Sequence, residues 1–293
     1  MWYNIYKGWI DSMNNIIDMK PRYFDERKEI QIFVEYLIDS DDTIHKTLAE
    51  EINNKGIKSI VIQTLLTKNE NIDYWPKLFD FLNKDSIEQL HLYIKFNDEI
   101  YKFKNIGQLG IYLHNYKNVN INQFNNLDSV VITGYNNNFE STILNDKIKN
   151  IAFWKFKKSS FDYKIDMNKV EKITFMNYTT LDIRNIKAEN IKSLSVDKTK
   201  KLLFNLDNLS NLNYLNLCSC DTSSINNEVI GNLKQLEELW LEKCDLSFID
   251  ENTISLLPKL KVLVIDKCKN LKTISGMKGL ERFVILNTKV EEE

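Results

Sequence analysis

The chain contains few of the residues on which turns, metal sites and catalytic loops depend. Its 293 residues include only 8 Gly, 3 Pro, 4 Cys and 3 His. It has no Gly-rich phosphate loop followed by Lys-Ser/Thr, no His-Glu-x-x-His or Cys-x-x-Cys metal motif, and no Gly-x-Ser-x-Gly elbow. These absences remove the common signatures of nucleotide binding, zinc chemistry and serine hydrolysis. We therefore expect no enzyme, no catalytic residues, no cofactor and no metal site.

An excess of charge of one sign is also missing. The 39 basic residues nearly balance the 41 acidic ones, which leaves a net charge of −2. A dedicated nucleic-acid binder needs a one-sided positive field, so this class is disfavoured. Lys outnumbers Arg by 35 to 4 beside 36 Asn and 35 Ile, a bias that we attribute to A/T-rich codons.

Long apolar runs are absent as well. No run approaches the roughly 18 to 20 residues that cross a bilayer, because charged residues or Asn interrupt every candidate. The N-terminal segment has no basic start and no small-residue cleavage site, so no secretory signal is expected. We predict a protein that is not bound to membranes and stays in the cytoplasm. The hydrophobic content of 43% is enough for a continuous core and excludes global disorder.

The sequence does contain an internal repeat. Its clearest form spaces apolar residues as L-x-x-L-x-L, with Cys three residues later and a period of 24 residues. This form occurs at residues 212–220, 236–244 and 260–268, and a looser unit follows at 280–288. Seven earlier matches begin at Ile57, Ile87, Ile106, Leu127, Ile148, Val170 and Ile191. Eleven matches together indicate one repeating structural unit.

This pattern resembles the leucine-rich repeat family, as a bacterial-type intracellular member, over roughly residues 57–290. The resemblance implies a curved solenoid with one short parallel strand per repeat on its concave side. The residues support this independently, because template positions four and six are apolar and alternate with outward neighbours. One unit cannot bury its apolar face alone, so stacked neighbours complete the core. We predict an α/β repeat solenoid with one parallel sheet of ten or eleven strands.

The ninth template position departs from the family pattern. The family usually places Asn there, whereas this chain has Cys, Thr, Lys, His or an aromatic residue. Cys220, Cys244 and Cys268 share the position in consecutive repeats, so we expect a buried column of reduced thiols. Cys218 points to the opposite side of its strand. The varied residues at this position predict irregular turns between residues 87 and 180.

Residues 1–55 do not match the template. Within residues 25–38, Ile30, Phe33, Val34 and Leu37 lie at helical spacing, and residues 43–52 show a second helical pattern. We predict a helical N-terminal cap over 1–55 that covers the open edge of the first strand, followed by the solenoid over 56–293. A further short helix is expected near residues 74–82.

The residues expected to point outward from the concave sheet form a candidate partner-binding face. In the middle of the chain they are large and mostly aromatic: Tyr93, Tyr112, Trp154 and Met176. Further along they are mostly acidic and surround a Trp: Asp197, Tyr214, Glu238, Trp240, Glu242 and Asp266. Trp and Tyr dominate interface hot spots, although strands favour aromatic residues in any case. Lys155, Lys198, Lys243 and Lys267, at template position eight, directly follow outward residues and could neutralise the acidic zone. His91 is the one histidine expected on the exposed side.

These observations favour a monomeric, non-catalytic module that binds another protein on its concave face. The most specific hypothesis, by analogy with compact intracellular repeat proteins, is an immunity protein that sequesters a toxin. One alternative is a secreted or envelope-associated effector or adhesion protein. Another is an RNA-binding solenoid that uses the basic stretches 155–158 and 198–201.

Overall fold

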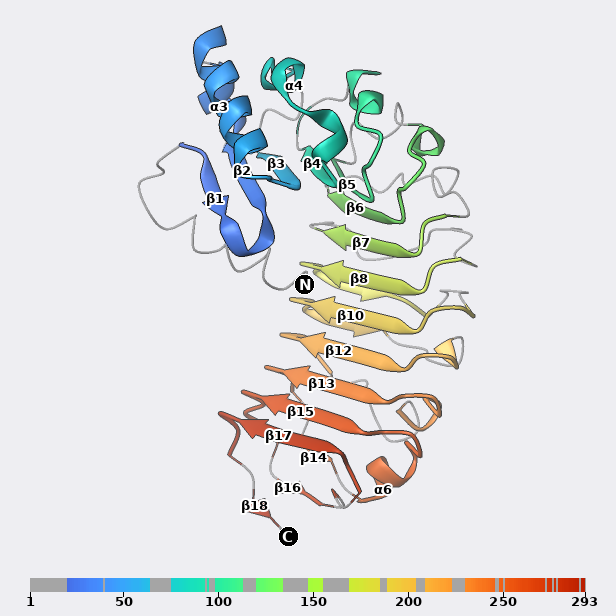
Figure 1. The fold of residues 1–293 in the computed structure, drawn as a ribbon. Helices are drawn as coiled ribbons and strands as arrows, with labels where there is room; N and C mark the ends of the chain where they lie inside the picture. The colour runs from blue at the N-terminus through green and yellow to red at the C-terminus, as the bar shows by residue number, and fades with distance from the viewer. Residues whose placement is uncertain are drawn as a thin grey trace. The chain divides into compact units, whose positions relative to one another are not determined.

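The structure is a computed structural model. It describes residues 20–38, 40–63, 75–92, 94, 98–112, 120–133, 147–154, 169–184, 189–203, 209–222, 230–245, 248–249, 251–271, 273–275, 277, 279–289 and 291–292. The chain divides into two compact units, Met1–Ile106 and Gly107–Glu293. Each unit contains short parallel strands that lie side by side in a ladder (Figure 1).

The first unit combines four strands with most of the helices. Its strands are β1 (Arg22–Phe24), β2 (Glu29–Phe33), β3 (Ser59–Gln63) and β4 (Gln89–Leu92). Its helices are η1 (Asp25–Arg27), α2 (Val34–Ile38), α3 (Asp42–Asn54), α4 (Leu78–Phe81), η2 (Lys84–Ser86) and η3 (Asp98–Lys102). Strand β1 is antiparallel to β2, and β2, β3 and β4 are parallel.

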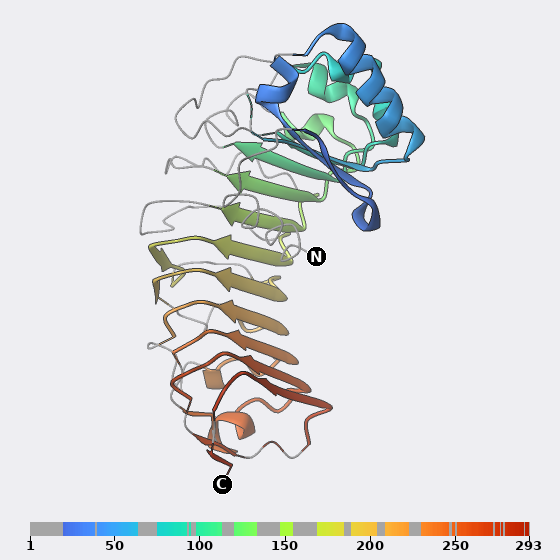
Figure 2. The same ribbon diagram turned by 90° about the vertical axis from the view of Figure 1, so that its left-hand side faces the viewer.

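The second unit is a longer ladder of the same kind, seen from a second side in Figure 2. Its order is β5 (Gln108–Tyr112), β6 (Ser129–Thr133), β7 (Asn150–Trp154), β8 (Lys172–Met176), β10 (Ser193–Asp197), β12 (Tyr214–Cys218), β13 (Glu238–Glu242), β15 (Val262–Asp266) and β17 (Arg282–Leu286). Two smaller sheets also belong to this unit: β9 (Thr180–Asp182) with β11 (Lys201–Leu203), and β14 (Phe248–Ile249) with β16 (Thr273–Ile274) and β18 (Glu291–Glu292). Two short helices complete the described elements, η5 (Ile121–Gln123) and α6 (Glu251–Ser255).

The strands stack in register with the sequence template. Leu215, Leu239 and Leu263 occupy position four of three successive repeats and are register partners. Each is at most 2% exposed, because every repeat covers the apolar side of its neighbour. A strand stands at each of the eleven predicted positions. The prediction of a parallel repeat solenoid is therefore confirmed.

Strand β2 corrects the prediction of one helix over residues 25–38. Within this range only the short helices η1 and α2 form, and Ile30 and Ile32 of β2 point into the core at 0% exposure. The carbonyl of Lys28 accepts hydrogen bonds from the N–H groups of Lys58 and Ser59, at 2.8 and 3.0 Å, as the carbonyl of Lys58 does in the next repeat. Parallel pairing with β3 therefore prevails over helical spacing. Strand β2 thus adds a strand before the eleven template matches, and its other side is paired by β1.

The second predicted helix of the N-terminal segment is confirmed as α3. The Asp41 carboxylate caps it by accepting a hydrogen bond from the Ile44 N–H at 3.0 Å. His45, Leu48, Ala49 and Ile52 form its buried face at helical spacing. Helix α4 (Leu78–Phe81) confirms a short helix within the range 74–82 where one was expected. The predicted division at residue 55 stays a prediction. No helix among the described residues is long and apolar enough to cross a membrane.

The cysteines at the ninth template position form hydrogen bonds to backbone carbonyls. The Cys220 thiol donates to the carbonyls of Val196 (3.4 Å) and Cys218 (3.2 Å). The Cys244 thiol likewise donates to the carbonyls of Leu217 and Glu242, and the Cys268 thiol donates to those of Leu241 and Asp266. In each case one carbonyl belongs to the preceding repeat and the other lies two residues before the cysteine. A compact side chain with a hydrogen-bond donor can therefore bond the backbone carbonyls of the turn in the absence of Asn.

Charged residues of opposite sign stack at template position two. Lys192 pairs with Glu171 at 3.1 Å and Lys261 with Glu237 at 2.7 Å, each across adjacent repeats. These side chains are largely exposed, so each pair contributes only ~0 to 1 kcal/mol. Each pair therefore adds a small contact between adjacent repeats.

We predict that Leu239→Ala destabilises the fold by ~2 to 5 kcal/mol, because it opens a cavity between two stacked repeats. Urea unfolding followed by circular dichroism measures this loss. Leu286→Ala is the matched control: Leu286 is 50% exposed, so its truncation changes the free energy of unfolding by ~0.5 kcal/mol or less. Equal losses in the two variants would contradict the inward and outward assignment.

The cysteines generate a second prediction. All four are buried, and Cys218, although it lies on the opposite side of its strand from the core, is only 6% exposed. Burial raises the pKa of Cys220 to about 12 and the pKa of Cys218 above its ordinary range. We expect iodoacetamide at pH 8 to leave all four thiols unmodified in the folded protein and to modify all four in urea, as read by mass spectrometry. Rapid native modification of Cys220, Cys244 or Cys268 would refute the buried column.

Candidate protein-binding face

The outward residues of the sheet, at template positions three, five and seven, are covered in one part of the chain and open in another. In β3 and β4, the outward residues Val61 and His91 are 2% and 3% exposed. In β7 and β8, Trp154 and Met176 are 7% and 9% exposed. The prediction that Trp154 and Met176 form an exposed aromatic zone is therefore wrong. They are register partners on adjacent strands, and their apolar side chains are packed inside the molecule.

Three other predicted residues of this region have different outcomes. Tyr93 lies outside the described residues, and of Tyr112 only the backbone, at the end of β5, is described. His91 was expected to be exposed, but burial excludes it from solvent and lowers its pKa to about 4. At neutral pH its imidazole is therefore uncharged.

Most outward residues of β10, β12, β13, β15 and β17 are partly exposed, with Cys218 and Val264 buried among them, and we call this surface the open face. It holds all six residues of the predicted acidic zone, and each of them is partly exposed: Asp197, Tyr214, Glu238, Trp240, Glu242 and Asp266. The register places Tyr214 beside Glu238 and places Glu242 beside Asp266. The ladder thus brings together side chains that are up to 69 positions apart in the chain.

Trp240 lies near the middle of the open face and is held in a defined orientation. Its indole Nε1–H donates to the Glu238 carboxylate at 3.2 Å. The guanidinium carbon of Arg282 lies 5.8 Å from the centre of its rings, within the range of a cation–π contact. Its register neighbours are Asn216 and Val264. A large, partly exposed aromatic side chain is therefore fixed before any partner binds.

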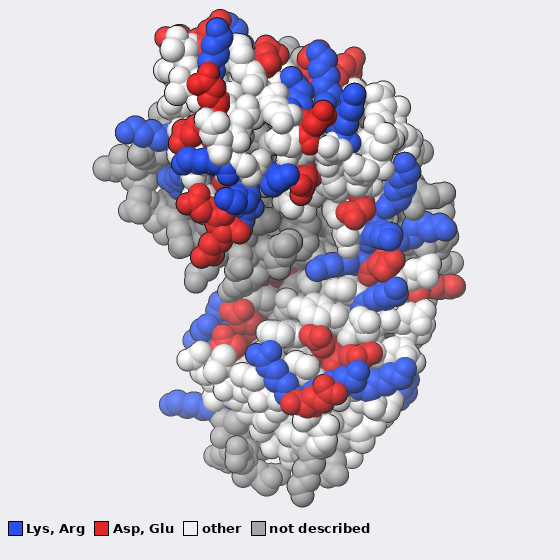
Figure 3. Space-filling view, in the orientation of Figure 1, with Lys and Arg blue, Asp and Glu red and all other residues white. Residues whose placement is uncertain are grey.

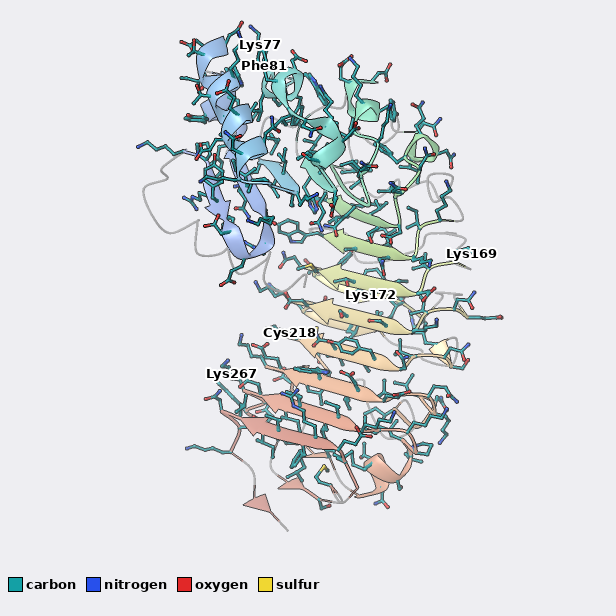
Figure 4. All side chains as sticks on the ribbon, viewed as in Figure 1. Lys77, Phe81, Lys169, Lys172, Cys218 and Lys267 are labelled. Carbon is teal, nitrogen blue, oxygen red and sulfur yellow. The ribbon has the colours of Figure 1, made fainter. Side chains whose placement is uncertain are left out.

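Lysines neutralise most of the acidic row at template position seven, as the sequence suggested. Glu242 pairs with Lys243 at 3.0 Å and with Lys267 at 4.0 Å. Asp266 pairs with Lys267 at 2.9 Å and accepts a hydrogen bond from the Asn287 side chain at 2.8 Å. The pKa of Asp266 is lowered, since these contacts outweigh its partial desolvation. Cys218 and Lys267 lie at the same end of their strands (Figure 4).

The lysines reach this row because the eighth template position turns the chain. Lys198, Lys243 and Lys267 adopt left-handed φ angles of 53°, 52° and 55°. Their backbone N–H groups extend the strand ladder to the next repeat, for example from Lys243 to the carbonyl of Asp266 at 2.8 Å. This backbone conformation is uncommon for residues other than Gly, Asn and Asp, so the stacked ladder holds it in place.

Asp197 is the exception in the acidic row. Its Oδ1 is buried and accepts no hydrogen bond from the part of the chain that the structure describes. Burial raises its pKa, which a hydrogen bond from the Cys218 thiol offsets only in part. The periodicity of the sequence placed Asp197 on this face but gave no sign that one oxygen of its carboxylate, Oδ1, would be buried without a donor.

Positive and negative side chains alternate over the surface. Figure 3 shows Lys and Arg interspersed with Asp and Glu over the visible surface, without a large patch of one sign. Among the described residues, no group of His, Cys, Asp or Glu could hold a metal ion. The open face therefore combines apolar and aromatic side chains with locally paired charges.

Solved leucine-rich-repeat structures resemble the chain at low identity. An internalin from Listeria monocytogenes is 15% identical with a TM-score of 0.40; the match covers 82% of this chain and 65% of the internalin, less than two thirds of its length. A leucine-rich-repeat protein of Leptospira interrogans is 15% identical with a TM-score of 0.41, over 84% of this chain and 70% of that one. The leucine-rich repeat domain of APL1B is 11% identical with a TM-score of 0.37, over 99% and 78%.

No protein-family model matches the sequence, and a search of curated proteins finds no match. The fold assignment therefore rests on the repeat spacing of the chain and on strands that pair in the register of that repeat. On this evidence the chain is a parallel repeat solenoid whose repeat spacing resembles that of leucine-rich repeats.

Proposed function

We propose that the chain is a non-catalytic module that binds another protein through the open face. The observation that supports this most is Trp240, which is partly exposed and is held by Glu238 and Arg282. Trp, Tyr and Arg are the residues most enriched among interface hot spots, and a preoriented side chain loses little entropy on binding. Tyr214 and Arg282 flank Trp240 on the same sheet.

The local charge pairing favours a protein over a nucleic acid. Lys243 and Lys267, which a phosphate backbone would need, already contact Glu242 and Asp266. RNA binding would require these pairs to separate before phosphate could replace the carboxylates. The basic stretch 155–158 lies outside the described residues, and in the stretch 198–201 Thr199 is buried.

The more specific proposal is an inhibitor that sequesters a toxin in the cytoplasm, in the manner of an immunity protein. It rests on analogy, and a gene for the target beside the gene for this chain would support it. The alternative is an effector or adhesion protein that acts outside the cell or at its envelope. Export of the chain into the culture medium would favour that alternative.

We predict that Trp240→Ala weakens binding of a partner captured from the source cell by ~2 kcal/mol or more, a roughly 30-fold rise in Kd. Isothermal titration calorimetry of the purified pair measures the change. The melting temperature should fall little, because Trp240 is partly exposed.

Trp154→Ala is the matched control, since Trp154 occupies an outward but buried position. Its truncation should cost ~3 to 5 kcal/mol of folding stability. Below its melting temperature it should leave the Kd nearly unchanged. Normal binding by Trp240→Ala, together with loss of binding in a variant on α3 or α4, would overturn the proposal.

A further inference from the structure

We propose that the free edge of β17 pairs with β17 of a second copy of the chain, in an antiparallel arrangement centred on Val284. This inference goes beyond the proposed partner binding and does not depend on it. It departs from the monomer expected from the sequence because of the way in which the last repeat ends.

The last repeat leaves its apolar side uncovered. Strand β17 is the last strand of the ladder, and within the described residues no strand pairs with its other side (Figure 1). Phe283, at template position four, is 37% exposed, whereas Leu239 and Leu263 at the same position are 2% and 0% exposed. Leu280 and Ile285, at positions one and six, are also partly exposed, although their counterparts in the preceding repeats are buried. This end of the core is therefore stabilised by any apolar surface that covers it.

The backbone of β17 also presents unpaired groups on this side. The Arg282 N–H donates to the Lys261 carbonyl at 3.0 Å, so the backbone groups of Arg282 face β15. Alternate residues of a strand direct their N–H and C=O groups to opposite sides. The N–H and C=O groups of Phe283 and Ile285 therefore face the free edge.

Two further groups extend this edge. In the preceding repeat, the carbonyl at template position two (Lys261) and the N–H at position eight (Lys267) bond to β17. The equivalent groups of the last repeat belong to Glu281 and Asn287, and Asn287 has a left-handed φ of 53°, close to the 55° of Lys267. Neither group has a backbone partner among the described residues. The free edge thus presents three carbonyls, at 281, 283 and 285, and three N–H groups, at 283, 285 and 287.

This set of groups is self-complementary about Val284. In an antiparallel pair centred there, Phe283 of each copy exchanges two hydrogen bonds with Ile285 of the other, and each Asn287 N–H meets the opposite Glu281 carbonyl. Every group of both edges then has a partner, and the exposed apolar side chains of the two copies cover each other. A two-fold interface uses the same surface on both subunits in this way. Strand β1 also has one side unpaired within the described residues, but its three residues are too few to span this edge.

Strand β17 lacks the features that commonly keep sheet edges apart, which are Pro, bulges and charges that point toward the edge. It reads Arg-Phe-Val-Ile-Leu, and its one charged side chain leans away from the free side. The guanidinium carbon of Arg282 lies 5.8 Å from the ring centre of Trp240, on β13, two strands back in the ladder. The Asn287 amide also turns back, to the Asp266 carboxylate at 2.8 Å. Both polar side chains therefore leave the edge open to a second strand.

The pairing has a consequence for the open face. The symmetry axis passes through the two Val284 residues perpendicular to the sheet, so the open faces of both copies lie on the same side. The two Trp240 residues then stand five strand spacings apart, roughly 24 Å. The dimer presents two equivalent binding surfaces in one direction.

Charges placed at residue 284 test the pairing. Val284 is outward and partly exposed, and in the dimer it lies opposite its own copy. At ~100 µM, sedimentation equilibrium of the native chain should give twice the 34.6 kDa of one chain. Val284→Lys and Val284→Glu should each reduce the mass to that of one chain, because like charges meet, and an equimolar mixture of the two variants should restore the dimer.

Ser195→Lys and Ser195→Glu are the matched controls. Ser195 is partly exposed at the same template position of β10, inside the ladder, so these changes should leave the dimer mass unchanged. Melting curves followed by circular dichroism check that each variant is folded.

Disulfide formation gives a second measurement that does not depend on added charge. In the proposed pair the two Cα atoms of residue 284 lie ~4.5 Å apart, within the range of a disulfide, while those of residue 286 lie roughly 14 Å apart. Val284→Cys should therefore cross-link under mild oxidation, and Leu286→Cys should not.

Three results would overturn the inference. The first is a native chain that has the mass of one copy at ~100 µM. The second is cross-linking by Leu286→Cys without cross-linking by Val284→Cys. The third is a dimer or larger assembly that persists in both Val284→Lys and Val284→Glu, because it would use another surface.

Discussion

The stacking of inward Leu and Ile side chains between successive repeats is the interaction on which the rest of the structure depends. One repeat has too little apolar surface to fold alone, so each needs the next to exclude water from its core. Leu215, Leu239 and Leu263 meet in register for this reason. The same register fixes every other column of the ladder, including the thiols at position nine and the charges at position two.

The packing of the core determines which positions point outward, but it does not determine which residues occupy them. Because the strand period is two, the register that places Leu239 and Leu241 inward also places Glu238, Trp240 and Glu242 outward. The turn at position eight then brings lysines beside the carboxylates. A surface built in this way is rigid before binding, since its side chains project from paired strands and several of them are already hydrogen-bonded.

The spacing of apolar residues predicted which side of a strand each side chain faces. The structure shows in addition which of the outward side chains are buried by other parts of the chain. The spacing of the apolar residues was sufficient to locate eleven strands and the helix α3. It missed β2, because Arg27 stands at template position one of that repeat, where the other repeats have an apolar residue. It also placed both Trp154, at template position seven, and Trp240, at template position five, on the outward side of the sheet. Only tertiary packing, which no local pattern encodes, distinguishes the buried Trp154 from the partly exposed Trp240.

The central claim is that the open face of β10 to β17 binds a protein partner. Hydroxyl-radical footprinting of the complex against the free chain tests it most directly, since oxidation reports the solvent exposure of individual side chains. We predict that Tyr214 and Trp240 are oxidised in the free chain and protected in the complex, while the buried Trp154 and Met176 react slowly in both. Protection confined to α3 and α4, with Tyr214 and Trp240 oxidised equally in both states, would contradict the account.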